Sequence, residues 1–459
     1  MVQGVVGHLV AGMVHRGQEL TVAEGTHRHD HGGRHTHEHV ADGCSVPASA
    51  RTVAEQLAAV LAAVAPLPPA LVSLDEALGL VLAEDIRSAT DTPPFDNSAM
   101  DGYAVRRADL LGATEQTPVS LPVVADLAAG TAQNPRLETG QVARIMTGAP
   151  IPDGADAVVP IEDTDQGTQT VQVMRPPGPA AHIRRAGEDA HAGDTVLTRG
   201  SELWPTRIAA AASAGTSGLR AHPAPRVAVI STGSELVTPG EPTRRGQIPD
   251  SNSYLLAAAV AEAGGVPIRL GAVPDDENTL RSLLTSLAGT VDAIVLSGGV
   301  SVGAYDVVKA VLAPLGTVRF GPVKMQPGKP QGFGRWPADA DGTDGPVIFA
   351  LPGNPVSAFV SFEAFVRPAL RRMGGHSELF RPTVDAVAAE SWASPAGRAQ
   401  YMPVMLRRDG TRTLARRAAA GGSGSHLVAG LGQAQGLAIV PEDVTRIDEG
   451  GPVTVMLVT

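Results

Sequence analysis

The sequence predicts a multidomain protein of α/β plus β class, organised around a central, mostly parallel α/β sheet. In residues 226–375, short apolar runs alternate with helical patterns, which is typical of a parallel sheet covered by helices on both faces. Residues 88–180 hold only short alternating runs separated by Pro, Gly and Asp, which indicates an all-β module. From about residue 382 the helical patterns stop again, so a small β-barrel-like module is expected at the end.

Length and charge limit the possible classes of protein. A chain of 459 residues is too long for one compact core, so roughly two to four domains are expected. A net charge of −11 and an aromatic content of 3% disfavour binding to nucleic acid or to an anionic membrane. No apolar run is long enough to span a bilayer, and residues 2–14 lack the basic region of a signal peptide. With Cys44 as the single cysteine, the expected location is the reducing cytoplasm.

The first 50 residues differ in composition from the rest of the chain. Six histidines lie close together: His27, His29, His31, His35, His37 and His39. The segment has no helical or strand period, so we expect a disordered, solvated tail with adventitious metal affinity. A functional Zn²⁺ or Ni²⁺ site in the tail is the alternative.

Helix signals begin at residue 52. Thr52 and Glu55 form a capping box before an apolar helical stripe over 53–64, and Pro66 ends that helix. Ser73 and Glu76 form a second capping box, which predicts a short helix over 74–82. A further helix is expected over 205–214.

The α/β region and the β module each supply a series of expected elements. In the α/β region we expect strands at 227–230, 267–273, 291–296, 318–323 and 347–351, and helices at 253–263, 278–287, 306–312 and 355–373. In the β module we expect strands at 102–105, 118–124, 141–146, 157–162 and 170–174.

Three turns rich in Gly, Ser and Thr follow expected parallel strands, at 231–235, 297–303 and 352–355. Ligands of an open parallel sheet bind at the carboxyl ends of its strands, where glycines and helix N-termini present N–H groups to anions. One such turn is most simply explained by tight geometry alone. Three turns on one edge favour a ligand that carries phosphate.

Carboxylates follow the same strands. Glu235 and Asp306 lie beside the Gly-rich turns, and Asp275 and Asp276 follow the strand at 267–273. Carboxylates beside a phosphate repel it unless a hard cation such as Mg²⁺ lies between them. Helix N-capping is the alternative; we favour it for Asp276, whereas for Asp306 we favour contact with metal or substrate.

Lysines bracket a Pro-Gly turn, with Lys324 before it and Lys329 within it. Such a turn can hold positive charge toward an oxyanion, although an idle surface pair is the simpler alternative. Two further polar segments stand out, 95–103 and 184–189. The simpler alternative is a set of Asx turns for the first and a surface ion-pair loop for the second.

Eight motifs in order resemble the molybdopterin molybdenumtransferases, a family that includes bacterial enzymes and the C-terminal part of gephyrin. They are FDNSAMDGYAV (95–105), RIMTGAPIP (144–152), RRAGED (184–189), ISTGSEL (230–236), DSN (250–252), SGGVSVGAYD (297–306), QPGKP (326–330) and LPGNPVSA (351–358). The resemblance runs from about residue 51 to the end.

The resemblance implies a four-domain subunit in a homodimer. It places a discontinuous, dimer-forming α+β domain at 51–87 and 181–221, with the β domain 88–180 inserted into it. The molybdopterin-binding α/β domain would span 222–375 and the C-terminal β domain 376–459.

The resemblance also implies the reaction and its residues. Adenylylated molybdopterin and molybdate would be the substrates, and Mg²⁺-dependent cleavage of the pyrophosphate would release AMP. Glu235, Asp275 and Asp306 would bind metal, and Asp306, Glu235, Asp189 and Asp101 would be catalytic. Substrate would be bound by Ser297, Gly298, Gly299, Ser301, Gly303, Thr147, Lys329, Pro352 and Pro355. Gln326 departs from the family's pattern, because many relatives carry Lys there.

Two other functions remain open for this architecture. One is a molybdopterin adenylyltransferase, which performs the preceding step and is also a candidate partner. The other is a non-catalytic scaffold, which would not need the carboxylates of the sheet edge.

Overall fold

The computed structural model describes residues 50–300, 306–337 and 344–459. The chain divides into unit 1 (Met1–Leu67 and Ala224–Thr459) and unit 2 (Pro68–Pro223). The histidine-rich segment, Cys44 and two predicted substrate-binding residues, Ser301 and Gly303, lie outside the described residues.

The centre of unit 1 is a six-stranded, mostly parallel sheet, which contains the five predicted strands and one more. Its strands, in spatial order, are β16 (Val266–Val273), β13 (Arg226–Thr232), β17 (Ala293–Ser297), β21 (Val347–Leu351), β20 (Pro330–Arg335) and β18 (Val318–Pro322). The first four are parallel, and β20 is antiparallel to both of its neighbours.

Strand β20 is missing from the sequence-based prediction because its composition opposes strand formation. Pro330, Gly332 and Gly334 give it few strand-favouring side chains. Gly332 is needed where Phe320 of β18 packs across the sheet, since a Cβ at residue 332 would lie 2.6 Å from the Phe320 ring. The strand therefore forms through packing that its local sequence does not show.

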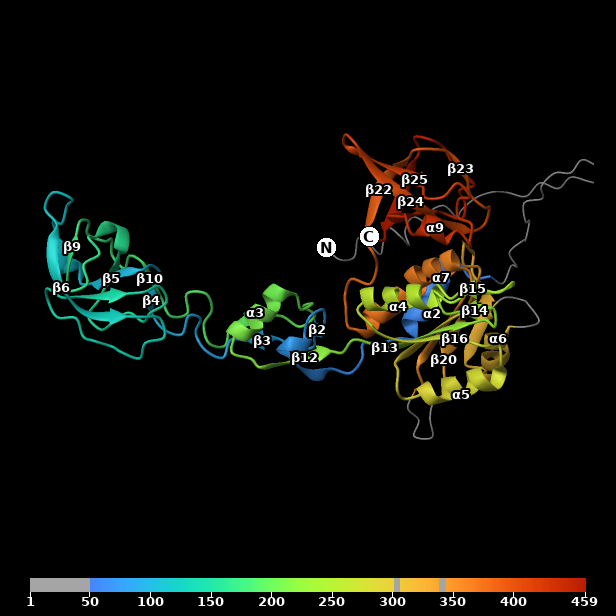
Figure 1. The fold of residues 1–459 in the computed structure, drawn as a ribbon, viewed down its shortest axis with the longest axis horizontal. Coiled ribbons are helices and arrows are strands. Elements are labelled where there is room, and N and C mark those ends of the chain that lie inside the picture. The colour runs from blue at the N-terminus through green and yellow to red at the C-terminus, as the bar shows by residue number, and fades with distance from the viewer. Residues whose placement is uncertain (1–49, 301–305, 338–343) are drawn as a thin grey trace, which may run out of the picture. The chain divides into compact units, whose positions relative to one another are not determined.

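Helices cover both faces of this sheet (Figure 1). Helices α4 (Asn252–Glu262) and α2 (Val53–Ala62) lie on one face, and α5 (Glu277–Leu287) and α6 (Val307–Leu312) lie on the other. Alternate residues of each central strand point to opposite faces of the sheet and pack into one of two hydrophobic cores. The core beneath α4 contains Val229, Val295 and Phe349, and the core beneath α5 contains Ile230, Leu296 and Ile348.

The expected helix over 355–373 is interrupted. It consists of α7 (Pro355–Ser361), one π-helical turn (Phe362–Val366) and α8 (Arg367–Met373). Pro368 lacks an N–H, so the regular hydrogen-bond pattern cannot continue through it, and the widened turn lies just before it.

Helix α2 begins as predicted. Thr52 Oγ1 accepts from Glu55 N at 3.1 Å, and Glu55 Oε2 accepts from Thr52 N at 2.8 Å. The helix packs on α8 and the π-helical turn, within unit 1. The boundary between the units thus falls at Leu67, inside the segment 51–87 that the resemblance assigns to one domain.

The C-terminal part of unit 1 is a closed barrel. Strand β24 (Ala399–Asp409) pairs with both β25 (Arg412–Arg417) and β26 (Gly436–Val440). The ring is completed through β22 (Thr383–Ala388) and β28 (Pro452–Leu457), which confirms the predicted barrel-like module. The two-residue strand β19 (Met325–Gln326) joins the barrel to the α/β sheet region by pairing with β24.

Unit 2 contains the predicted β module. Its five-stranded sheet has the order β8 (Ala157–Pro160), β5 (Gly102–Val105), β7 (Val142–Ile145), β6 (Val119–Leu127) and β9 (Thr170–Val173). A second sheet of unit 2 joins distant segments: β12 (Gly218–His222) lies between β1 (Ala70–Ser73) and β2 (Val81–Leu82). Helix α3 (Pro205–Ser213) agrees with the predicted helix over 205–214.

The predicted helix over 74–82 is wrong. The chain forms one 3₁₀ turn (Leu74–Glu76) and then strand β2. The Ser73 hydroxyl donates to the Glu76 carboxylate at 2.9 Å instead of accepting from the backbone, so no capping box forms. Gly79, at φ +79°, then turns the chain in a direction that a helix does not take.

Nowhere in the described ranges is a helix both long and apolar enough to cross a bilayer.

Candidate functional site at the edge of the central sheet

Strand register brings the predicted residues of unit 1 to one edge of the sheet. Thr232 is level with Val273, Ser231 with Ser297, and Ser297 with Leu351, so the carboxyl ends of the four parallel strands are aligned. Glu235, Asp275, Gly298 and Pro352 each follow one of these ends.

Lys329 lies at the same edge by a different route. It directly precedes β20, whose antiparallel course places its first residues beside the carboxyl end of β21, with Gly332 level with Ala350. Pro330 is in turn level with Pro322, the last residue of β18. The edge at the carboxyl ends of the parallel strands therefore carries Glu235, Gly298 and Lys329, as the sequence predicts.

The turn after β17 requires glycine for steric reasons. Gly298 and Gly299 have φ values of +100° and +63°. A Cβ at residue 298 would lie 2.6 Å from Thr232 O, and one at residue 299 would lie 3.0 Å from Val308 of α6. The turn therefore holds β13, β17 and α6 close together, with bare backbone at the sheet edge.

Asp306 stands at the start of α6 without capping it. Its Oδ2 atom is buried and has no hydrogen-bond partner among the described residues. Lys309 N of α6 donates to Gly299 O at 3.2 Å, so the helix start lies against the glycine turn. A buried, unpartnered carboxylate oxygen is costly, and a ligand would remove that cost.

The other carboxylates of the edge have different environments. Glu235 is exposed, and its carboxylate folds over Gly233, since a Cβ at residue 233 would lie 2.6 Å from Glu235 Oε2. Asp275 Oδ2 accepts from Ser234 N at 3.0 Å, and Asp275 N donates to Ser234 Oγ at 3.1 Å. Asp276 caps α5 through Thr279, whose hydroxyl bond lowers the Asp276 pKa, so the capping interpretation is confirmed.

The turn that carries Lys329 is anchored from beneath. Gln331, which is buried, donates to Gly328 O and to Ser361 Oγ, both at 2.7 Å. Val323 N donates to Lys329 O at 2.8 Å, which fixes the backbone of the lysine. The turn can therefore hold a positive charge in a defined place.

Two elements of this edge come from the C-terminal barrel and are absent from the sequence-based prediction. Arg398 directly precedes β24, where Ala399 N donates to Lys324 O at 3.0 Å, and its Nε is buried without a partner among the described residues. Ser425 Oγ accepts from Asn354 Nδ2 at 2.9 Å, and Val356 N donates to Ser425 O. The Gly- and Ser-rich run at 421–425 is a sequence signal for the second element, but it does not follow a strand of the α/β region.

Prolines shape the last turn of the edge. Pro352 follows β21 directly, and Pro355 is the first residue of α7. Gly353 between them packs on Gly298, since a Cβ at residue 353 would lie 3.3 Å from Gly298 Cα. The turns after β17 and β21 are thus in contact.

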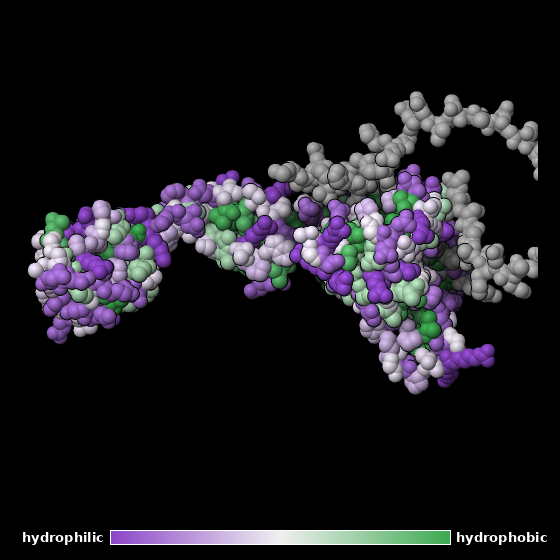
Figure 2. Space-filling view, turned by 90° about the horizontal axis from the view of Figure 1, so that it is seen from above, coloured by the Kyte–Doolittle hydropathy of each residue, from purple (hydrophilic) through white to green (hydrophobic). Residues whose placement is uncertain are grey.

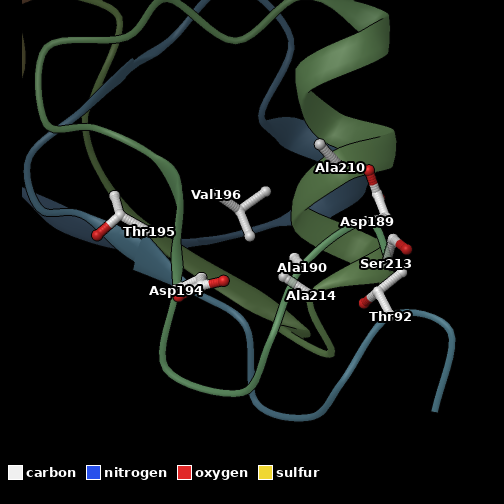
Figure 3. Close-up of a pocket in the computed structure, with 9 residues that line it drawn as sticks. All are labelled: Thr92, Asp189, Ala190, Asp194, Thr195, Val196, Ala210, Ser213 and Ala214. Carbon is white, nitrogen blue, oxygen red and sulfur yellow. The ribbon is translucent and has the colours of Figure 1, made fainter. Parts of the chain in front are cut away.

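The predicted residues of unit 2 form a separate group. Asp101 Oδ1 accepts from Thr147 N at 2.7 Å and from Thr147 Oγ1 at 2.8 Å, and these bonds hold the pKa of Asp101 below its usual value. Asp189 lines a pocket of about 480 Å³ beside α3. Figure 3 shows Asp189, Thr92 and Ser213 at one end of this pocket and Asp194 with Thr195 at the other.

The segments 95–103 and 184–189 also contact each other within unit 2. Arg185 pairs with Asp96, whose carboxylate accepts from Ala186 N at 2.9 Å. The backbone bond from Ala186, together with Arg185, lowers the pKa of Asp96. This part of the two motifs is explained by local structure.

The edge fits a hard divalent cation that also binds phosphate. Asp306 offers a buried free oxygen and Glu235 an exposed carboxylate, which are the oxygen ligands that Mg²⁺ prefers. Within the described ranges no three His, Cys, Asp or Glu side chains form a ready-made metal cluster. Mg²⁺ sites of phosphoryl-transfer enzymes commonly use only one or two carboxylates, and the remaining ligands are phosphate oxygens and water.

Fold and edge together define a class: a multidomain α/β and β protein with glycine-rich turns and carboxylates at the carboxyl ends of its parallel strands. Three family profiles match the chain: the MoeA N-terminal region (domains I and II) at 51–215, a probable molybdopterin binding domain at 228–372, and the MoeA C-terminal region (domain IV) at 385–458.

Individual relatives agree with the profiles. A molybdopterin molybdenumtransferase 2 of Mycobacterium tuberculosis is 43% identical over 412 residues, covering 88% of this chain and 97% of the relative. A molybdopterin molybdenumtransferase of Nostoc is 37% identical over 389 residues, covering 84% of this chain and 88% of the relative. The crystal structure of the molybdopterin biosynthesis MoeA protein from Pyrococcus horikosii matches with a TM-score of 0.71 and 33% identity, covering 89% of this chain and 99% of that one.

The chain therefore belongs to the molybdopterin molybdenumtransferase family. The predicted family, fold class and enzyme class are confirmed by these matches.

Proposed function

We propose that this chain inserts molybdenum from molybdate into adenylylated molybdopterin, with Mg²⁺-dependent cleavage of the pyrophosphate and release of AMP. One observation carries the proposal. The Gly298–Gly299 turn and Asp306, with its unpartnered oxygen, share one sheet edge with Lys329. This combination suits a phosphorylated anion that is bound together with a cation.

Each part of the edge has a role in the proposal. Glu235, Asp275 and Asp306 hold Mg²⁺, which when bound neutralises the pyrophosphate and makes AMP a better leaving group. Gly298 and Gly299, with Ser297, Pro352 and Pro355, shape the substrate-binding turns. Ser301 and Gly303, which lie outside the described residues, are proposed to bind substrate as well. Lys329 holds molybdate, and Arg398 adds a second positive charge nearby.

The proposal extends to unit 2 through Asp101, Thr147 and Asp189, which lie in motifs that match the family. It includes a homodimer formed through the domain that contains β1 and α3. Leu71, Leu78 and Trp204 support it, because these large apolar side chains are 74%, 61% and 50% exposed. Figure 2 shows apolar patches interrupting the polar surface in this view of the molecule.

The proposed location of the protein is the cytoplasm.

The test is an insertion assay with purified protein, adenylylated molybdopterin, Mg²⁺ and molybdate. We expect AMP and molybdenum-loaded pterin in equal amounts, and no AMP without Mg²⁺. Accumulation of adenylylated pterin from molybdopterin and ATP would instead favour the adenylyltransferase. Absence of turnover with every substrate would favour the scaffold.

A further inference from the structure

A buried chain of hydrogen bonds lies beneath the sheet edge and ends at Asp250. Asp250 is 3% exposed and stands between the end of β15 (Ile248–Pro249) and α4. Its Oδ1 accepts from Ser231 Oγ at 2.9 Å and from Ser253 N at 3.0 Å, and its Oδ2 accepts from Ser253 Oγ at 2.5 Å. All of these groups donate to the carboxylate.

The direction of the chain determines what Ser297 can do. Ser231 has one hydroxyl proton and donates it to Asp250. In the 3.2 Å contact between Ser231 Oγ and Ser297 Oγ, Ser297 must therefore be the donor. Ser297 Oγ keeps only acceptor capacity, so it can receive an N–H but cannot donate to a phosphate oxygen.

On the Ser253 side of Asp250, Arg269 supplies positive charge to the hydrogen-bond chain. Arg269 Nη1 donates to Ser253 Oγ at 3.2 Å, and Ser253 passes its own proton to Asp250. The Arg269 guanidinium also stacks over the Tyr254 ring at 4.0 Å, which fixes its position. On both the Ser231 side and the Ser253 side, each hydroxyl proton is thus donated toward the Asp250 carboxylate.

A second acceptor lies beside Ser297. Asn252, the first residue of α4, donates from Nδ2 to Gly353 O at 2.6 Å, which sets the orientation of the amide. Its Oδ1 is buried and has no partner in the part of the chain that the structure describes, and the whole residue is 8% exposed. An amide oxygen in this state costs free energy until a donor reaches it.

The two acceptors belong to one corner of the edge. Asn252 contacts Gly353, Gly353 packs on Gly298, and Gly298 follows Ser297. The backbone N–H of Ser253 at the start of α4 is already bound to Asp250, so that donor is not available to an anion. The corner therefore holds oxygen acceptors that are buried, since Ser297 is 1% and Asn252 8% exposed, whereas the adjacent Gly298–Gly299 turn has no side chains.

We propose that the corner defined by Asn252, Ser297 and Gly353 is a subsite for the N–H-bearing edge of the ligand's heterocycle, and not for its phosphate. An aminopyrimidinone ring offers adjacent amino and ring N–H donors, which suit two neutral acceptors. Asp250 is the positioning residue that keeps Ser297 an acceptor. The inference rests on the proposed function and says which end of the substrate lies at this corner.

The test compares the binding of pterin, lumazine and AMP to the full chain by fluorescence titration or calorimetry. In lumazine a carbonyl oxygen replaces the amino group of the pyrimidine ring. Wild-type protein should prefer pterin about tenfold, because lumazine sets acceptor against acceptor. Asn252→Ala should remove most of this preference and leave AMP affinity unchanged.

Ser231→Ala gives a second, directional result. Without Ser231 Oγ, Ser297 loses the acceptor of its hydroxyl proton and can turn outward as a donor. We expect the preference to shift toward lumazine. The matched control is Ser286→Ala, which removes an exposed hydroxyl of α5 that donates to Leu283 O; it should keep the wild-type preference.

Each other outcome has a defined meaning. An unchanged preference for pterin in both variants overturns the inference, as does a parallel loss of AMP and pterin affinity, which would indicate a structural role. Loss of Mg²⁺ affinity in Asn252→Ala with the preference intact would make the corner a cation site instead. Wild-type protein that binds AMP but not pterin overturns the inference alone, and protein that binds neither contradicts the proposed function as well.

Discussion

Two charged clusters of unit 1 differ in how their charges are paired. In the first, Arg381 Nε lies 2.7 Å from Glu363 Oε2 and its Nη1 lies 2.8 Å from Glu262 Oε1. Arg367 completes it, at 3.9 Å from Glu363 and 3.8 Å from Glu262. In the second, at the sheet edge, Asp306 Oδ2 and Arg398 Nε are buried without partners among the described residues.

The difference separates a structural cluster from the proposed ligand site. The Glu363 cluster joins α4, the π-helical turn and the segment before β22. Each of its two arginines has a carboxylate within 4.0 Å, although Arg367 Nη1 makes no hydrogen bond among the described residues. Hydrogen bonds from Arg381 lower the pKa of Glu262, and although burial opposes it, the bonds to Glu363 and Glu262 raise the pKa of Arg381. The edge leaves polar atoms unsatisfied, which is expected where substrate supplies the missing partners.

The largest expected effect follows from breaking the structural cluster. Glu363→Ala leaves Arg381 and Arg367 buried with too little negative charge, and it should destabilise the fold by about 3–5 kcal/mol. Chemical denaturation measures this change. A loss below about 1 kcal/mol would show that the cluster is not structural.

The same substitution should leave the AMP affinity of the folded fraction unchanged. A specific loss of AMP binding without destabilisation would reverse the distinction between the two clusters.

Asp306→Asn should have the opposite profile. It removes a cation ligand from a site that is already unsatisfied, so AMP release should fall about 100-fold while the unfolding midpoint stays near that of the wild type. Asp276→Asn is the matched control, because asparagine also caps helices and residue 276 has no role in the site. Equal activity of the two variants would remove Asp306 from the metal site.

Lys329→Ala should raise the molybdate concentration for half-maximal insertion about tenfold with little change in maximal rate, because one charge of the oxyanion site is lost. Arg412→Ala, which removes an exposed charge at the start of β25, serves as the control. If both variants saturate at the wild-type molybdate concentration, Lys329 does not bind the oxyanion.

The smallest effect concerns pH. Because the pKa of Glu262 is lowered in the folded state, its contribution to stability is present above its unfolded-state pKa and is lost as the pH falls through the lowered folded value. Thermal unfolding between about pH 5 and pH 3 should show a slope that Glu262→Gln reduces. An identical slope in the variant would assign the acid sensitivity to other carboxylates.

Much of this architecture can be predicted from the sequence because its signals are local. The alternation of apolar runs and helices predicts the parallel strands, and the Thr52 capping box predicts the start of α2. Turns that follow parallel strands predict that Glu235 and Gly298 share an edge, since the topology alone aligns the strand ends.

The remaining features depend on contacts between distant residues. Arg398 reaches the edge through the pairing of β24 with β19, and β20 carries a glycine at residue 332 because Phe320 packs there. The capping box at Ser73 fails because the Ser73 hydroxyl bonds to the Glu76 side chain and Gly79 redirects the chain. None of these pairings leaves a local pattern.

A crystal structure of the chain with AMP, Mg²⁺ and molybdate bound tests the proposed site most directly. We expect the AMP phosphate at the Gly298–Gly299 turn, Mg²⁺ between that phosphate and Asp306, and molybdate beside Lys329. Ligands bound elsewhere, with Asp306 Oδ2 still unpartnered, would contradict it.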